Sequence, residues 1–133
     1  MTRKIFAVSL MLIMAAFAVA YDGPKTVTIK GHLIDNMCAG EPGEDKDYED
    51  EAKGHTLSCA LMSHCHKSGF AVAEGRNLYK LDAAGNKLAD RVLKTTKAAK
   101  SQKGLLVEVE GTVEGTTLKA TKITEVAAAA AAQ

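Results

Sequence analysis

Hydrophobic and polar residues alternate along two long stretches of this chain, residues 26–34 and 105–113. Apolar residues fill nearly every second position, and mostly polar side chains stand between them. This period of two is typical of a half-buried β-strand. Gly31 and Gly111 fall at apolar positions of the two stretches, where a missing side chain favours a bend. We therefore predict two long, strongly coiled strands.

The same pattern, in shorter pieces, predicts three further strands. Residues 70–74 and 78–81 flank a Gly-Arg-Asn turn and form a predicted hairpin. Residues 118–126 alternate as well, but the phase slips between Ala120 and Ile123. Such a slip indicates a β-bulge, an extra residue in one strand.

Two segments have helical rather than strand character. Residues 56–67 read as one short helix, with Thr56 as its N-cap and Gly69 just beyond its end. A second helix is expected to start at Asn86, where apolar residues recur at spacings of three and four. Residues 35–54 are rich in acidic side chains and are interrupted by Gly40, Pro42 and Gly43, so we predict a solvated loop there.

The predicted order is strand, insertion with a helix, strand, strand, helix, strand, strand. Five short strands with a helix between the third and the fourth are typical of an OB-type barrel. The fold class we expect is mainly β with helices. It is a five-stranded OB-like small barrel with the acidic loop and a helix inserted after the first strand, at residues 36–68. An open α+β sheet is the alternative.

The start of the chain has the features of a secretory signal peptide. Arg3 and Lys4 precede an apolar run at residues 5–17, and an Ala-Val-Ala cleavage site follows. We predict a signal peptide at residues 1–20 and a periplasmic or secreted mature protein. A single OB-like domain is then expected at residues 21–126.

The remaining composition limits the classes of partner. Residues 127–133 form a nearly pure alanine tail that we expect to be disordered. The formal net charge of the chain is +1, and no basic stripe is present. This argues against a nucleic-acid partner. After cleavage of the signal peptide, no apolar stretch of membrane length remains, so we expect no membrane association; a protein partner cannot be named.

Cysteine and histidine gather in one part of the chain. Residues 55–66 hold two of the three cysteines and three of the four histidines, and Cys38 follows the first predicted strand. Cys38, His55, Cys59 and Cys65 make a Cys₃His donor set, which suits tetrahedral zinc or cuprous copper. We therefore predict a metal-binding protein whose role, structural or in metal trafficking, stays open.

A disulfide is the main alternative to a metal. Exported proteins meet an oxidising environment, and three cysteines allow one intrachain bond and one free thiol. A bond from Cys38 to Cys59 or to Cys65 would tie the acidic insertion to the helix. The protein would then be a disulfide-stapled OB-like binding module without a metal.

Other uses of the same residues have weaker support. His55, Cys59, Met62 and His66 would share one stripe of a continuous helix and would suit copper. Covalent haem would need a cysteine where Met62 stands. A thiolate nucleophile beside a histidine is conceivable, but no C-x-x-C pair or Ser/His/Asp pattern accompanies it. The sequence thus favours a protein that is not an enzyme.

Several short motifs along the chain occur together in one group of proteins. They are Gly31-x-x-x-Asp35-x-x-Cys38, His55-x-x-x-Cys59-Ala60 followed by Cys65, and Leu78-Tyr79-x-Leu81. In this pattern the chain resembles a group of small, largely uncharacterised exported bacterial proteins with an OB-fold-like layout. The resemblance implies export and a barrel but no activity. His64 and His66 lie outside the shared pattern.

Overall fold

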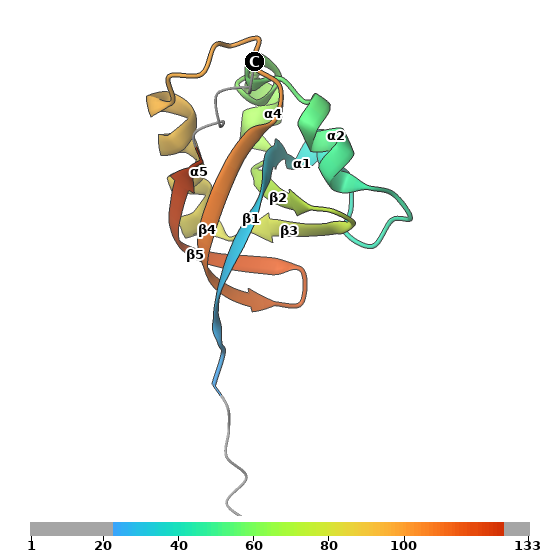
Figure 1. The fold of residues 1–133 in the computed structure, drawn as a ribbon, viewed down its shortest axis with the longest axis vertical. Coiled ribbons are helices and arrows are strands. Elements are labelled where there is room, and N and C mark those ends of the chain that lie inside the picture. The colour runs from blue at the N-terminus through green and yellow to red at the C-terminus, as the bar shows by residue number, and fades with distance from the viewer. Residues whose placement is uncertain (1–22, 127–133) are drawn as a thin grey trace, which may run out of the picture.

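The computed structural model describes residues 23–126, which form a closed β-barrel (Figure 1). The strand order around the barrel is β1-β2-β3-β5-β4. All neighbouring strands are antiparallel except β3 and β5, which are parallel. This confirms the predicted mainly β fold with helices and an OB-like small barrel, and the sheet is not open. The strands are β1 (Thr26–Asp35), β2 (Phe70–Glu74), β3 (Asn77–Leu81), β4 (Leu105–Glu114) and β5 (Thr117–Glu125).

The two glycines at apolar strand positions are required by close backbone contacts. A Cβ atom on Gly31 would lie 2.3 Å from the carbonyl oxygen of Ala73. A Cβ atom on Gly111 would lie 2.2 Å from the carbonyl oxygen of Lys119. No side chain fits at either position, which explains why the alternating pattern is interrupted there. The predicted bulge is also present, because the β4–β5 register shifts between Glu110 and Gly111.

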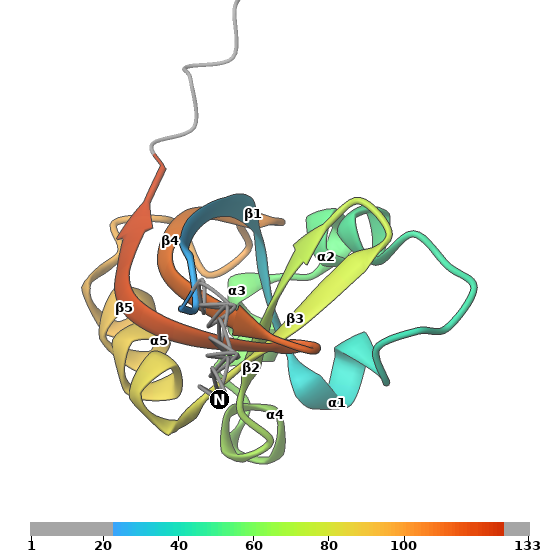
Figure 2. The same ribbon diagram turned by 90° about the horizontal axis from the view of Figure 1, so that it is seen from below.

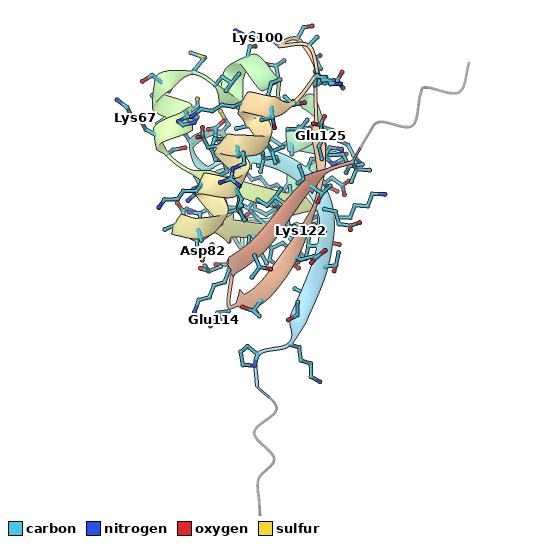
Figure 3. The ribbon with its side chains drawn as sticks, turned by 90° about the vertical axis from the view of Figure 1, so that its left-hand side faces the viewer. Lys67, Asp82, Lys100, Glu114, Lys122 and Glu125 are labelled. Carbon is cyan, nitrogen blue, oxygen red and sulfur yellow. The ribbon has the colours of Figure 1, made fainter. Side chains whose placement is uncertain are left out.

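Helix α5 (Ala83–Thr95) lies between β3 and β4 in the chain and packs against the barrel. Its apolar face buries Ala89 and Leu93 in the barrel core. The predicted start at Asn86 is wrong: the N-cap is Asp82, four residues earlier, which accepts a 2.8 Å hydrogen bond from the Gly85 N–H. Asp82 lies at this end of α5 in Figure 3. Asn86 instead accepts a 2.8 Å hydrogen bond from the Phe70 N–H.

The insertion at residues 36–68 is more structured than the sequence indicated. The predicted acidic loop contains two helices, and the predicted helix over residues 56–67 is split in two at Leu61 and Met62. Seen from below in Figure 2, α1 and α2 lie on the side of the barrel opposite α5. The four helices are α1 (Asn36–Ala39), α2 (Tyr48–Gly54), α3 (Leu57–Ala60) and α4 (Ser63–Lys67).

A second, smaller apolar cluster holds α1 and α2 against the barrel. Their small residues Ala39 and Ala52, with the ring of Tyr48, pack on the outer face of β1, β2 and β3. Alanine at positions 71 and 73 of β2 leaves room for this close approach. The insertion therefore lies directly over the end of β1, where the first candidate ligands follow.

Two predictions on the termini concern residues outside those that the structure describes. The predicted signal peptide, residues 1–20, and the alanine tail, residues 127–133, both fall there. Within residues 23–126, none of the helices combines the length and the apolar character needed to cross a membrane. The predicted boundaries of the domain stay predictions.

Candidate metal centre

Four side chains from different elements meet where β1 leads into the insertion. Asp35 is the last residue of β1, Cys38 lies in α1, His55 follows α2, and Cys59 lies in α3. One ligand atom of each lies within 4.8 Å of those of the other three. We call these residues the Asp–Cys–His–Cys cluster. Their donors are a carboxylate oxygen, an imidazole nitrogen and two thiols, which together can hold a metal ion.

The two cysteines of the cluster are placed by the same local device. Asp35 caps α1 and accepts a 3.0 Å hydrogen bond from the Cys38 N–H. Thr56 caps α3 and accepts a 3.2 Å hydrogen bond from the Cys59 N–H. In each case the capping side chain binds the N–H three residues later, which fixes the start of the helix. Both thiols are therefore carried by the first turn of a capped helix.

Backbone contacts from a distant part of the chain position His55 and α3. The Gly104 N–H donates to the His55 carbonyl oxygen over 3.0 Å, and the Leu57 N–H donates to the Gln102 carbonyl oxygen over 3.0 Å. The loop that precedes β4 thus fixes the segment carrying His55 and Cys59. The cluster depends on four separate parts of the chain, so it forms only when the chain is folded.

Asp35 and His55 form an unusual buried pair. Asp35 Oδ2 and His55 Nε2 are 2.8 Å apart, and their side chains are 0% and 9% exposed. The two groups are not oriented for a hydrogen bond with each other. Neither atom has another hydrogen-bond partner among residues 23–126. A buried carboxylate oxygen or imidazole nitrogen without a partner is costly. A cation bound between the two atoms would satisfy both.

The Cys38 thiol is protonated at neutral pH. Burial, followed by the nearby Asp35 carboxylate, raises the pKa of Cys38 to about 12. Thiols in this state are poor nucleophiles, because the thiolate is the reactive form. The Cys38 thiol therefore gives no support to thiol catalysis. A bound cation reverses this preference, because coordination deprotonates a thiol.

Cys65 lies at the buried side of the same group. Burial, followed by the charge of the Asp35 carboxylate, raises the pKa of its thiol. Cys65 is 2% exposed, whereas Cys38 and Cys59 are half-buried. Cys65 is thus next to the Asp–Cys–His–Cys cluster without belonging to it.

All three cysteines are free thiols in this structure. The disulfide of the alternative interpretation therefore has no support in the geometry. Of the four predicted ligands, the structure brings Cys38, His55 and Cys59 together and adds Asp35, which the sequence analysis did not propose as a ligand. The signal that could have identified Asp35 is its capping position three residues before Cys38.

The rival helical stripe of His55, Cys59, Met62 and His66 does not form, because these residues do not lie in one continuous helix. Because the helix breaks at Met62, His66 does not continue the stripe of His55 and Cys59. His66 Nε2 lies 2.6 Å from Asp90 Oδ1 of α5, and its ring meets Phe70 edge-on. Figure 3 shows the side of the molecule on which α4, ending at Lys67, lies beside α5. His64 is exposed.

No known protein-family model, curated protein or solved structure matches this chain. The resemblance to exported bacterial proteins thus stays a prediction. The Asp–Cys–His–Cys cluster and the fold that builds it are therefore the features that bear on function.

Proposed function

We propose that this protein binds a zinc or copper ion at the Asp–Cys–His–Cys cluster, with Cys65 as an alternative ligand. The observation that carries the proposal is the buried pair of Asp35 Oδ2 and His55 Nε2, 2.8 Å apart and without hydrogen-bond partners among the described residues. The neighbouring thiols of Cys38 and Cys59 complete four donors of the types that zinc and copper prefer.

The predicted export of the chain fits this function. Under the oxidising conditions of the periplasm or the extracellular space, neighbouring free thiols tend to form disulfides. A bound metal ion would protect them, because coordinated sulfur is less available for exchange. The ion would also join the end of β1 to α3, so that metal binding and the order of the insertion are coupled.

The test is elemental analysis of the purified mature protein, combined with thiol counting before and after chelation. We expect about one zinc or copper ion per chain, with thiols that react fully only after the chelator is added. His55→Ala should lose the ion, and His64→Ala serves as the matched control because His64 is exposed. The proposal would be overturned if the purified protein contained no metal and its thiols reacted to the same extent before and after the chelator is added. One disulfide and one reactive thiol would favour the stapled module instead.

A further inference from the structure

Asp35 uses its two carboxylate oxygens in different ways. Oδ1 caps α1 by accepting a 3.0 Å hydrogen bond from the Cys38 N–H. Oδ2 lies 2.8 Å from His55 Nε2 and has no hydrogen-bond partner among residues 23–126. An N-cap needs only one oxygen acceptor, which an asparagine would provide without a buried negative charge. The capping role therefore explains Oδ1 and leaves the buried Oδ2 unexplained.

The donor types of the Asp–Cys–His–Cys cluster match zinc better than copper. Thiolate sulfur, imidazole nitrogen and carboxylate oxygen are the ligands of zinc in proteins. Cuprous copper selects soft thiolate and thioether sulfur, whereas carboxylates suit harder cations. A cuprous ion on the two thiols, with or without His55, would leave Asp35 Oδ2 unsatisfied. An ion that binds all four donors removes that cost.

The charge of the donors favours a divalent ion as well. With both thiols deprotonated by coordination and His55 neutral, the four donors carry three negative charges. A divalent ion leaves one of these charges uncompensated, and a monovalent cuprous ion leaves two. Because an uncompensated buried charge is costly, Zn²⁺ suits the cluster better than Cu⁺ does.

The cluster also has the features of a closed site. Its four donors all come from the chain, and α1 and α2 lie beside the end of β1 that carries Asp35 (Figure 1). A catalytic zinc ion has three protein ligands and one open position, whereas a structural zinc ion has four protein ligands. The side chains of Asp35 and His55 are 0% and 9% exposed, so a partner at the surface has no access to this pair.

We infer that the ion is Zn²⁺, bound by Asp35, His55 and the sulfurs of Cys38 and Cys59, and that it is structural: it holds α1 and α3 against the end of β1. The inference rests on the proposed metal-binding function and assigns its metal and its role. It makes Asp35, not Cys65, the fourth ligand. Helices α1 and α3 have four residues each, too few to persist without such support.

The first experiment tests Asp35 with a substitution that keeps its cap. Asparagine caps a helix as well as aspartate does, so Asp35→Asn removes the carboxylate but not the bond to the Cys38 N–H. Asp47→Asn is the matched control, because Asp47 caps α2 by accepting a 3.0 Å hydrogen bond from the Asp50 N–H and lies outside the cluster. The affinity for Zn²⁺ is measured on metal-stripped, reduced mature protein by competition with a chromophoric chelator.

Asp35→Asn should weaken Zn²⁺ binding by more than about tenfold, since even a residue behind a ligand contributes about 10- to 100-fold. Asp47→Asn should bind Zn²⁺ like wild type. An affinity of Asp35→Asn within about twofold of wild type would overturn Asp35 as a ligand. Co²⁺ used in place of Zn²⁺ reports the geometry independently. Strong visible absorption with a thiolate-to-cobalt charge-transfer band supports a tetrahedral site, and the weak spectrum of six-coordinate Co²⁺ would overturn the closed site.

The second experiment identifies the metal in protein produced with both zinc and copper supplied. We expect about one zinc ion per chain and no copper. One copper ion per chain without zinc would overturn the assignment of zinc and leave the proposed metal-binding function intact. Absence of both metals, with no uptake of Zn²⁺ or of Cu(I) from its bicinchoninate complex, would refute the proposed function itself.

The third experiment tests the structural role by hydrogen exchange. With free Zn²⁺ at about 100 times its Kd, amides that exchange only after the ion leaves should exchange about 100-fold more slowly. We expect this for the Cys38 and Cys59 N–H groups in wild type and not in Asp35→Asn. Zn²⁺ binding that changes their exchange by less than about twofold would overturn the structural role.

Urea denaturation separates a metal ligand from a simple partner of His55. With chelator in place of Zn²⁺, Asp35→Asn should be at least as stable as wild type, because it keeps the cap and removes a buried, unpaired charge. With Zn²⁺ present, wild type should be the more stable of the two. An equal loss of stability for Asp35→Asn under both conditions would show that Asp35 stabilises the fold without a metal, and would overturn the inference.

Discussion

The barrel and the insertion at residues 36–68 are stabilised in different ways. The barrel encloses large apolar side chains, such as Phe70, Val107 and Leu118, in a continuous sheet. The insertion consists of helices of only 4, 7, 4 and 5 residues. Helices this short are not stable by themselves in water. They are held by capping side chains, by a small alanine-rich cluster against the barrel, and by a few long-range hydrogen bonds.

This difference separates stability from function in the molecule. The barrel provides most of the buried apolar area, which is the dominant favourable contribution to folding. The candidate ligands lie almost entirely in the insertion, which has little buried area of its own. The geometry of the metal site therefore depends on a few polar contacts that can loosen while the barrel stays folded. Three mutations test this view.

Leu118→Ala should have the largest effect, because it removes a fully buried side chain from the barrel core. We expect a loss of about 2–5 kcal/mol in the free energy of unfolding, measured by urea denaturation with circular dichroism. The backbone amides of the insertion should lose their protection from hydrogen exchange in the same transition, because its helices have no support without the barrel. Leu106→Ala, the same truncation at a half-buried position of β4, should cost clearly less. If the amides of α2 stayed protected from hydrogen exchange after the barrel unfolds, the insertion would not depend on the barrel for its structure.

Tyr48→Phe should affect the insertion alone. The buried Tyr48 hydroxyl donates a hydrogen bond to the Glu41 carbonyl oxygen and accepts a 2.8 Å bond from the Glu44 N–H. Its loss should cost about 1 kcal/mol locally, so amides of α2 should exchange several-fold faster while those of β4 and β5 do not change. Tyr79→Phe is the matched control, because no hydrogen bond involves the Tyr79 hydroxyl within residues 23–126. Equal acceleration in the barrel would show that the two regions unfold together.

The same contrast explains what the sequence could predict. The barrel strands follow from alternation, the coiling of β1 and β4 from Gly31 and Gly111, and the β4–β5 bulge from a slip in phase. Each of these signals repeats over many residues or reflects a backbone contact that admits only glycine. The fold class was therefore predictable without any reference to a known structure.

The insertion gave weaker signals because its elements are too short to show a period. Helix α1 has four residues, and its only mark in the sequence is the capping relation of Asp35 and Cys38. A break at Met62 cannot be seen in a pattern that suits one continuous helix. The sequence identified Cys38, His55, Cys59 and Cys65 as candidate ligands. It missed Asp35, whose burial beside His55 depends on contacts between distant segments.

Asp90→Asn should have the smallest effect, and it tests the link between the insertion and α5. Asp90 Oδ2 accepts a 2.7 Å hydrogen bond from Lys94, and Asp90 Oδ1 lies 2.6 Å from His66 of α4. The hydrogen bond from Lys94, and then the one with His66, lowers the pKa of Asp90 below its ordinary value of 3.8. The folded protein thus favours the ionised carboxylate, which stabilises the fold at neutral pH.

The expected loss for Asp90→Asn at neutral pH is at most about 1 kcal/mol, because partly exposed ion pairs contribute little. The difference from wild type should be complete above pH 3.8 and shrink as the pH falls through the lowered pKa of Asp90, since protonation then removes the charge in wild type as well. Urea denaturation at several pH values measures it. Asp45→Asn, at a 96% exposed carboxylate paired with Arg76, is the control and should change little. A loss for Asp90→Asn that persists undiminished well below pH 3.8 would refute the charge of Asp90 as the link between α4 and α5.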